Sequence, residues 1–232
     1  MNGETYLKLS EFLTGKKGGA VLFEPYISKT NTETLIWRRG LELWDRAEHY
    51  FFTQLSLAER CLSDCVILDL DFFGDRENKE KLISLTASAD HAGKEFCVIC
   101  EDRDESELCE RMNEKGNARI GVLGLYGNAA SMRTPSVRMD GTIEEAVKRG
   151  ESGYFVRSGI RSCIEKYGDD IHLLGGLGTE FISSLKLASI YAEIDEVFGI
   201  SGGNWAVGSG GEISADNYLQ LISLLGAYLR LK

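Results

Sequence analysis

The sequence lacks any apolar run that approaches the roughly 18 residues needed to span a bilayer. Its first residues, MNGETYLKLSEF, lack the basic and then apolar segments of a secretory signal. Basic residues are also in deficit, because 26 Lys and Arg stand against 36 Asp and Glu, a formal net charge of -10. This balance argues against nucleic acid or an anionic membrane as the main partner. We therefore expect a cytoplasmic protein that binds neither nucleic acid nor membrane.

A second CxxC motif is also missing. Cys97 and Cys100, in 95-EFCVICED-102, have the spacing used by zinc sites and redox turns. The surrounding residues read as a strand, however, and residues three apart on a strand point to opposite faces. Four zinc ligands would need another such pair. We therefore interpret these residues as reduced core cysteines and expect neither zinc nor structural disulfides.

Short apolar runs alternate with helical patterns along the chain, which is typical of a parallel α/β fold. The runs predict strands that are buried on both faces, at 20–23, 65–73, 96–100, 119–126, 153–156, 171–174 and 204–208. The patterns between and after them predict helices at 31–62, 76–92, 104–115, 142–149, 159–167, 180–198 and 214–231. An eighth strand fits within the irregular segment 132–141, MRTPSVRMDG.

This alternation favours a closed barrel over an open sheet. Eight-stranded barrels need about 200 residues and typically have about 250, and this chain has 232. An open, doubly wound sheet would be expected to carry a GxGxxG fingerprint after its first strand, where this sequence has 23-FEPYISKTNTET-34. No low-complexity linker divides the chain. We predict one domain, residues 1–232, folded as a compact (β/α)8 TIM-type barrel.

In such a barrel, functional residues collect where strands end and loops begin. Asp69 and Asp71, in 64-DCVILDLDFFGD-75, lie two apart in an apolar strand, so both would face the same space. Carboxylates there can bind a cation, accept hydrogen bonds from ligand N–H groups or share a proton. The structural explanation is a loop cap or an ion pair with an arginine. His172 lies within its own strand run, where a core histidine and a catalytic one both fit the pattern.

Arginines near other strand ends have two interpretations as well. Arg157 closes the strand 153–156, and Arg133 and Arg138 flank the proline of the irregular segment. Each can bind a carboxylate or phosphate of a ligand. Each can equally form a structural ion pair with an acidic residue such as Asp69, Asp71 or Glu101.

Two glycine-rich segments follow apolar runs near the end of the chain. In 170-DIHLLGGLGTEFI-182, the glycines either allow tight packing of a strand-to-helix turn or clear the backbone for a ligand. We predict ligand binding at Gly175 and Gly176, and at Ser209 beside the second glycine segment, 208–211.

Three segments resemble the uroporphyrinogen decarboxylase superfamily. The segments 166-KYGDDIHLLGGLGTEFI-182 and 205-WAVGSGGEISADNYLQLI-222 are similar, in order and separation, to the C-terminal part of that family. The run 64-DCVILDLDFF-73 resembles its second-strand motif. The resemblance implies a (β/α)8 barrel that forms a homodimer and catalyses decarboxylation of porphyrinogen acetates or cobamide-dependent methyl transfer.

The resemblance also implies roles for individual residues. Asp71 falls at the family's catalytic aspartate, which accepts the pyrrole N–H groups of a tetrapyrrole. Tyr126 matches the active-site tyrosine, and His172 matches the histidine that the methyltransferase branch uses. Arg157 and Asp69 would then help to bind the ligand.

Departures from the family's pattern leave other functions open. Only Lys29 carries positive charge in 24-EPYISKTNTE-33, where the decarboxylases have an arginine-rich loop. Leu174 stands where the methyltransferase branch has its first zinc cysteine, so zinc is not expected. One alternative is a degenerate barrel that binds a partner in corrinoid methyl-transfer systems, with the corrinoid as substrate or held by a corrinoid protein. Another is a phosphate-binding barrel that uses the 208–211 segment.

Overall fold

The structure is a computed structural model of the whole chain. It describes residues 20–21, 47–60, 65–70, 73–88, 95–100, 103–115, 120–123, 136–184, 186–201, 204–210, 224 and 227–228. Within these residues, strands and helices alternate as the sequence predicts. None of the helices in the described part of the chain combines the length and apolar character needed to cross a bilayer.

The described strands form one parallel sheet of eight strands in the order β1-β8-β7-β6-β5-β4-β3-β2. The strands are β1 (Ala20–Val21), β2 (Cys65–Asp69), β3 (Glu95–Ile99), β4 (Ile120–Leu123), β5 (Ser136–Arg138), β6 (Gly153–Val156), β7 (His172–Leu177) and β8 (Trp205–Ser209). From β2 to β8 each strand pairs with the next strand in the chain, and β1 pairs with β8. The predicted eighth strand is β5, within the irregular segment, as expected.

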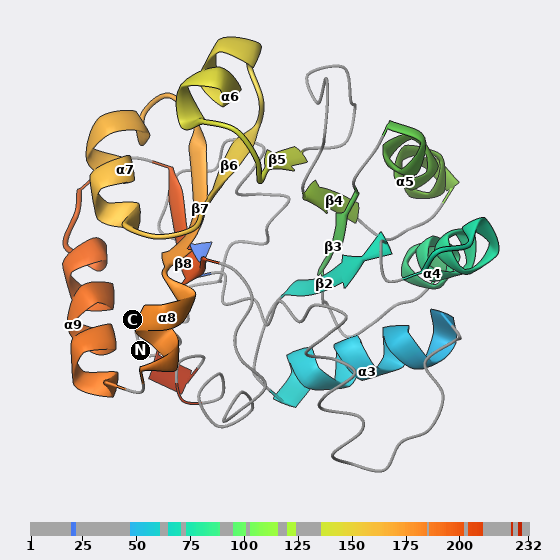
Figure 1. Cartoon of the computed structure of the whole chain (residues 1–232), viewed down its shortest axis with the longest axis horizontal. Helices are drawn as coiled ribbons and strands as arrows, with labels where there is room; N and C mark the ends of the chain where they lie inside the picture. The colour runs from blue at the N-terminus through green and yellow to red at the C-terminus, as the bar shows by residue number, and fades with distance from the viewer. Residues whose placement is uncertain are drawn as a thin grey trace, which may run out of the picture.

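In the described residues, helices precede β2, β3, β4, β6, β7 and β8 in the chain and pack against the sheet. They are α3 (Ala47–Arg60), α4 (Arg76–Ser88), α5 (Arg103–Lys115), α6 (Ile143–Arg149), α7 (Ile160–Tyr167), α8 (Thr179–Ser183) and α9 (Leu187–Phe198). Figure 1 shows α3 to α7 and α9 around the periphery, with the strands between them. This arrangement makes the fold α/β, with a face of the sheet under the helices and an opposite, inner face.

Two hydrophobic clusters join the helices to the sheet. The first lies among α6, α7, α9 and strands β6 to β8, and the second among α3, α4, α5 and strands β2 and β3. Fully buried side chains such as Phe51, Phe96, Ile160 and Leu173 fill them. Burying a side chain of this size stabilises the fold by about 1.5 to 3 kcal/mol. The clusters therefore account for the attachment of the helices to the outer face of the sheet.

Local sequence fixes the ends of α6. Thr142 accepts a hydrogen bond from the amide of Glu145, and the Glu145 carboxylate accepts one from the amide of Thr142. This reciprocal pair is a capping box, which satisfies amides that have no partner within the helix. Gly150 ends the helix in the left-handed conformation, with φ 70°. Both ends agree with the prediction of a helix over 142–149.

The single helix predicted over 180–198 is wrong, because α8 and α9 are separate helices. The hydroxyl of Ser184 donates to the carbonyl of Phe181 at 2.6 Å and competes for the backbone acceptor there. Lys186 then leaves helical geometry, with φ -78° and ψ 68°. The predicted helix over 214–231 lies almost entirely outside the described residues.

Candidate functional site

Alternation along the strands separates the two faces of the sheet. Leu68 of β2, Val98 of β3 and Val156 of β6 belong to the clusters under the helices. Successive side chains of a strand point to opposite faces. Asp69, which follows Leu68, and Phe155, which precedes Val156, therefore point to the inner face. The candidate site is the edge of this inner face at which the parallel strands end.

Asp69 is the last residue of β2 and thus lies at this carboxyl edge. Its amide donates to the phenol oxygen of Tyr50, from α3, at 3.0 Å. Tyr50 is fully buried, and its ring contacts Phe73 edge to face with centroids 5.7 Å apart. The buried phenol therefore holds the end of β2 against α3 and positions Asp69 where the sequence predicted a ligand-binding carboxylate.

The predicted strand over 65–73 is too long, because β2 ends at Asp69 and Leu70 begins a turn. The amide of Phe73 donates to the carbonyl of Leu70 at 3.2 Å across this turn. The inference that Asp69 and Asp71 share one face assumed a strand through Asp71, two residues beyond the end of β2, and it stays a prediction. Asp71 itself lies outside the described residues, as does Tyr126, and their predicted catalytic roles stay predictions.

Arg157 follows β6 directly and is exposed at the same edge of the sheet. Its backbone is packed closely, since a Cβ at Gly210 would lie 1.7 Å from the carbonyl oxygen of Arg157. The amide of Gly210 also donates to the carbonyl of Leu177, the last residue of β7, at 2.7 Å. The segment after β8 thus joins the ends of β6 and β7, and the side chain of Arg157 projects from a fixed backbone.

Gly175 and Gly176 lie inside β7 and not in a loop, which corrects the strand predicted to end at 174. Both are buried, and both have φ 92°, a conformation that disfavours any side chain. A Cβ at Gly176 would lie 2.1 Å from the Cβ of Ile160 in α7. Close packing of α7 on β7 therefore accounts for Gly176. A role for either glycine in ligand binding stays a prediction.

Ser209 is the last residue of β8 and pairs in register with Leu177. Its backbone is therefore at the carboxyl edge, beside the ends of β6 and β7. Of the predicted glycine segment 208–211, Gly211 lies outside the described residues. The structure thus brings Ser209 and Arg157 to one end of the sheet.

His172 is the first residue of β7 and pairs with Gly153, the first residue of β6. It consequently lies at the amino edge of the sheet, opposite the edge that carries Asp69 and Arg157. Its Nδ1 is 3.1 Å from the carbonyl oxygen of Ser152. Burial lowers the pKa of His172, although the contact with Ser152 opposes this shift. The structure therefore does not bring His172 to the candidate site.

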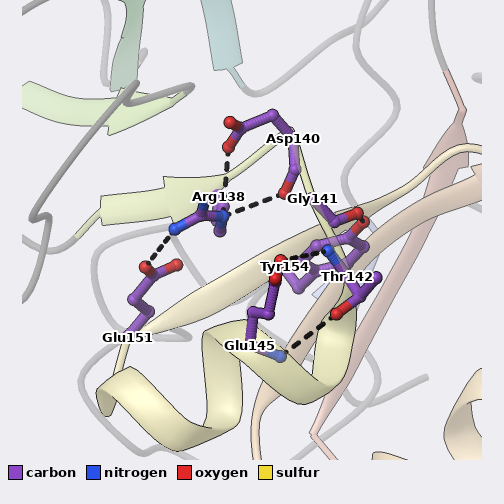
Figure 2. A network of polar contacts seen from close by, with 7 residues as sticks. All are labelled: Arg138, Asp140, Gly141, Thr142, Glu145, Glu151 and Tyr154. Atoms are coloured by element: carbon purple, nitrogen blue, oxygen red, sulfur yellow. Dashed lines mark hydrogen bonds and ion pairs between the residues drawn. The ribbon is translucent and has the colours of Figure 1, made fainter.

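Arg138, the last residue of β5, forms a buried polar network (Figure 2). Its Nη1 donates to Oε1 of Glu151 at 2.8 Å, and its Nε donates to the carbonyl oxygen of Asp140 at 2.9 Å. The Asp140 carboxylate lies 3.0 Å from the same nitrogen. Burial lowers the pKa of Arg138, but the hydrogen bond and charge of Glu151 outweigh it, so the pKa is raised.

This network holds the two connections of α6. Asp140 lies before the helix and Glu151 after it, and the Tyr154 hydroxyl donates to the carbonyl of Gly141 at 2.8 Å. The sequence predicted a structural ion pair as one role for Arg138, but with Asp69, Asp71 or Glu101. The true partners come from the turn before α6 and the turn after it, which only the packing of that helix brings together.

No group of three or more His, Cys, Asp or Glu side chains in the described ranges is arranged to hold a metal ion. What the described edge offers is a guanidinium and a carboxylate at the ends of different strands. Such groups can bind a carboxylate of a ligand and accept its N–H groups.

Comparison with known proteins adds no assignment. No family model matches the chain, and neither a curated protein nor a solved structure matches it. The resemblance to the uroporphyrinogen decarboxylase superfamily therefore rests on the three sequence segments alone.

Proposed function

We propose that this chain is a (β/α)8 barrel of the uroporphyrinogen decarboxylase type. Its carboxyl edge binds a carboxylated ligand related to tetrapyrroles or corrinoids and supports decarboxylation or methyl transfer. The observation that carries this proposal is the strand order, which runs through eight parallel strands in chain sequence and returns to β1 beside β8. A closed barrel needs only the pairing of β1 with β2 to complete the ring.

The residues at the carboxyl edge support a carboxylated ligand. Arg157 is exposed there, and a guanidinium binds a carboxylate through two parallel hydrogen bonds. Asp69 ends β2 at the same edge, and Asp71 follows in the sequence. A carboxylate in this region would accept N–H groups of a pyrrole ring. In this proposal Arg157 orients the ligand and Asp71 anchors it, with Tyr126 as a further orienting group.

One observation favours a second function, in which the barrel has lost catalysis and serves as a binding or partner subunit in corrinoid methyl transfer. Of the histidines in the described ranges, His172 lies at the amino edge and His49 is exposed on α3. His172 therefore cannot transfer a proton at the carboxyl edge. A barrel in which His172 does not reach the ligand could still bind that ligand.

The test is a spectroscopic titration of the protein with uroporphyrin, with its methyl ester, and with cobalamin. We expect uroporphyrin to bind and its ester to bind more weakly. Replacing Arg157→Ala should weaken uroporphyrin binding roughly 10- to 100-fold, because a charge-assisted hydrogen bond to the ligand is lost. Replacing Asp71→Asn should abolish binding without unfolding the protein.

The matched control is Arg161→Ala, because Arg161 is also an exposed arginine but pairs with Glu165 and Glu196 of α7 and α9. This variant should bind as the unchanged protein does. Turnover of uroporphyrinogen or of a methylated corrinoid would support the enzyme, whereas binding without turnover would support the partner subunit. Absence of binding to all of these ligands, or unchanged affinity in Asp71→Asn, would contradict the proposed site.

A further inference from the structure

Two buried cysteines touch each other beneath the carboxyl end of β3. Cys100 follows β3 directly, and Cys109 lies nine positions later in α5. Their Sγ atoms are 3.6 Å apart, and both residues are 0% exposed. Both are free thiols, and the Cys100 sulfur lies 3.8 Å from the carbonyl oxygen of Val98. In the sequence Cys100 shares a CxxC motif with Cys97, and that spacing does not predict the contact with Cys109.

The surroundings of the pair slow its thiol–disulfide exchange in the folded protein. The hydrogen bond with Cys109 and burial raise the pKa of the Cys100 thiol well above its usual value. The thiolate is the reactive form, so a raised pKa slows attack on a disulfide. Beside the pair, Lys79 of α4 forms a shielded ion pair with Glu105 in the first turn of α5. The helix that covers the thiols is therefore held by a charged contact.

We propose that Cys100 and Cys109 form a redox-sensitive dithiol, which a low-molecular-weight disulfide such as oxidised glutathione converts into a disulfide that links β3 to α5. A disulfide needs sulfur atoms about 2.05 Å apart. The two sulfur atoms, 3.6 Å apart, would therefore have to move together through rotation about the Cα–Cβ bonds. The link joins the end of a strand at the candidate ligand-binding edge to the helix outside it.

The reaction balances through thiol–disulfide exchange. One cysteine thiolate, having lost its proton to solvent, attacks oxidised glutathione and forms a mixed disulfide, which releases one glutathione thiolate. The second cysteine loses its proton and attacks the protein sulfur of that mixed disulfide. The Cys100–Cys109 bond forms and the second glutathione leaves. The protein gives up two electrons and two protons, and the oxidant becomes two molecules of glutathione.

Burial makes the reaction depend on local opening of α5, because glutathione cannot reach a thiol with no exposed surface. Cys163 of α7 is partly exposed and gives an internal comparison. We expect Cys163 to form a mixed disulfide first. The Cys100–Cys109 link should then form more slowly, at a rate set by opening of the helix.

The experiment treats the folded full chain with oxidised glutathione, blocks the remaining thiols, and maps tryptic peptides by mass spectrometry. Cleavage after Lys94, Arg103 and Arg111 places Cys100 in peptide 95–103 and Cys109 in peptide 104–111. We expect these two peptides to become linked and to separate on reduction. Cys97 shares the first peptide, so the variant Cys97→Ser removes that ambiguity and should keep the link.

Two further variants complete the test. Cys109→Ser should leave Cys100 without a link, whereas Cys163→Ser should leave the link intact. The proposal is overturned if Cys163 becomes glutathionylated while peptides 95–103 and 104–111 stay separate in the folded protein. It is also overturned if the link forms only in guanidinium, or if Cys97→Ser abolishes it while remaining folded.

Discussion

Ile160 occupies the space that a side chain at position 176 would need. A Cβ built on Gly176 would lie 2.1 Å from the Cβ of Ile160 and 3.0 Å from its Cα. Cβ atoms do not approach one another so closely, and the backbone of α7 would have to move. Gly176 thus allows α7 to pack closely on β7 beside the candidate edge.

Replacing Gly176→Ala should lower the free energy of unfolding by about 2 to 5 kcal/mol. About 1 to 2 kcal/mol comes from the positive φ and about 1 to 3 kcal/mol from overpacking against Ile160. Denaturant titration followed by tryptophan fluorescence measures the change.

Two other glycines separate these causes. Gly150 also has a positive φ, 70°, but nothing lies within 4 Å of the position of its Cβ. Gly150→Ala should therefore show only the conformational cost, about 1 to 2 kcal/mol. Gly74 has open space and no positive φ, so Gly74→Ala should stay within about 0.5 kcal/mol. Equal losses in the Gly176 and Gly150 variants would contradict close packing by Ile160.

Replacing Arg138→Met should destabilise the protein by about 3 to 5 kcal/mol, because the change leaves the Glu151 carboxylate buried without its cation. The Glu151 side chain is 0% exposed, and its Oε2 accepts no hydrogen bond from the described residues. The double variant Arg138→Met with Glu151→Leu should recover part of this loss, since no charge then remains buried. Thermal or denaturant unfolding measures both.

The surface pair of Arg161 and Glu196 is the control for this buried pair. Their side chains are 51% and 56% exposed, so Arg161→Met should cost less than about 1 kcal/mol. A loss in Arg138→Met no larger than in Arg161→Met would show that the network of Figure 2 does not hold α6.

Glu144 should make stability depend on pH in acid. The Tyr167 hydroxyl donates to its carboxylate, its own amide and Lys166 add to the effect, and together they lower the pKa of Glu144 from 4.5 to about 2. The folded protein therefore holds the ionised form more strongly than the unfolded chain does. This contribution is complete above pH 4.5 and is lost as the pH falls through about 2.

The variant Glu144→Gln should consequently have a lower urea midpoint than the unchanged protein near neutral pH, and the difference should shrink as the pH falls from 4.5 towards 2. Tyr167→Phe removes the largest cause of the shift and should reduce the same pH dependence. A difference that stays constant through this range would contradict the assignment.

Much of the fold follows from periodicity in the sequence. The apolar runs locate the strands, because a strand of a parallel sheet is buried on both faces and its neighbours in the chain are helical. Even β5, only three residues long, falls in the irregular segment where an eighth strand fits. The runs do not reveal where β2 and β7 end. Tertiary pairing extends β7 through Gly175 and Gly176, and a turn at Leu70 ends β2.

The same limits apply to the candidate site. Asp69 and Arg157 lie at the carboxyl edge as predicted, because the end of an apolar run marks the end of a strand. His172 was predicted to be catalytic from its resemblance to a family motif, yet it begins β7 and lies at the other edge. Two other contacts were not predicted. Arg138 ends β5 and contacts Glu151, which lies beyond the following helix. Cys100 follows β3 and contacts Cys109, which lies within the following helix.

The sequence alone determines that this chain alternates strands and helices, that its strands are apolar, and that charged residues follow several of them. These properties are local, since each depends on the spacing of neighbouring residues. The tertiary structure decides which strand lies beside which, how closely α7 approaches Gly176, and which charges and thiols meet in the interior. Those contacts depend on how helices pack on the sheet, which no single segment encodes.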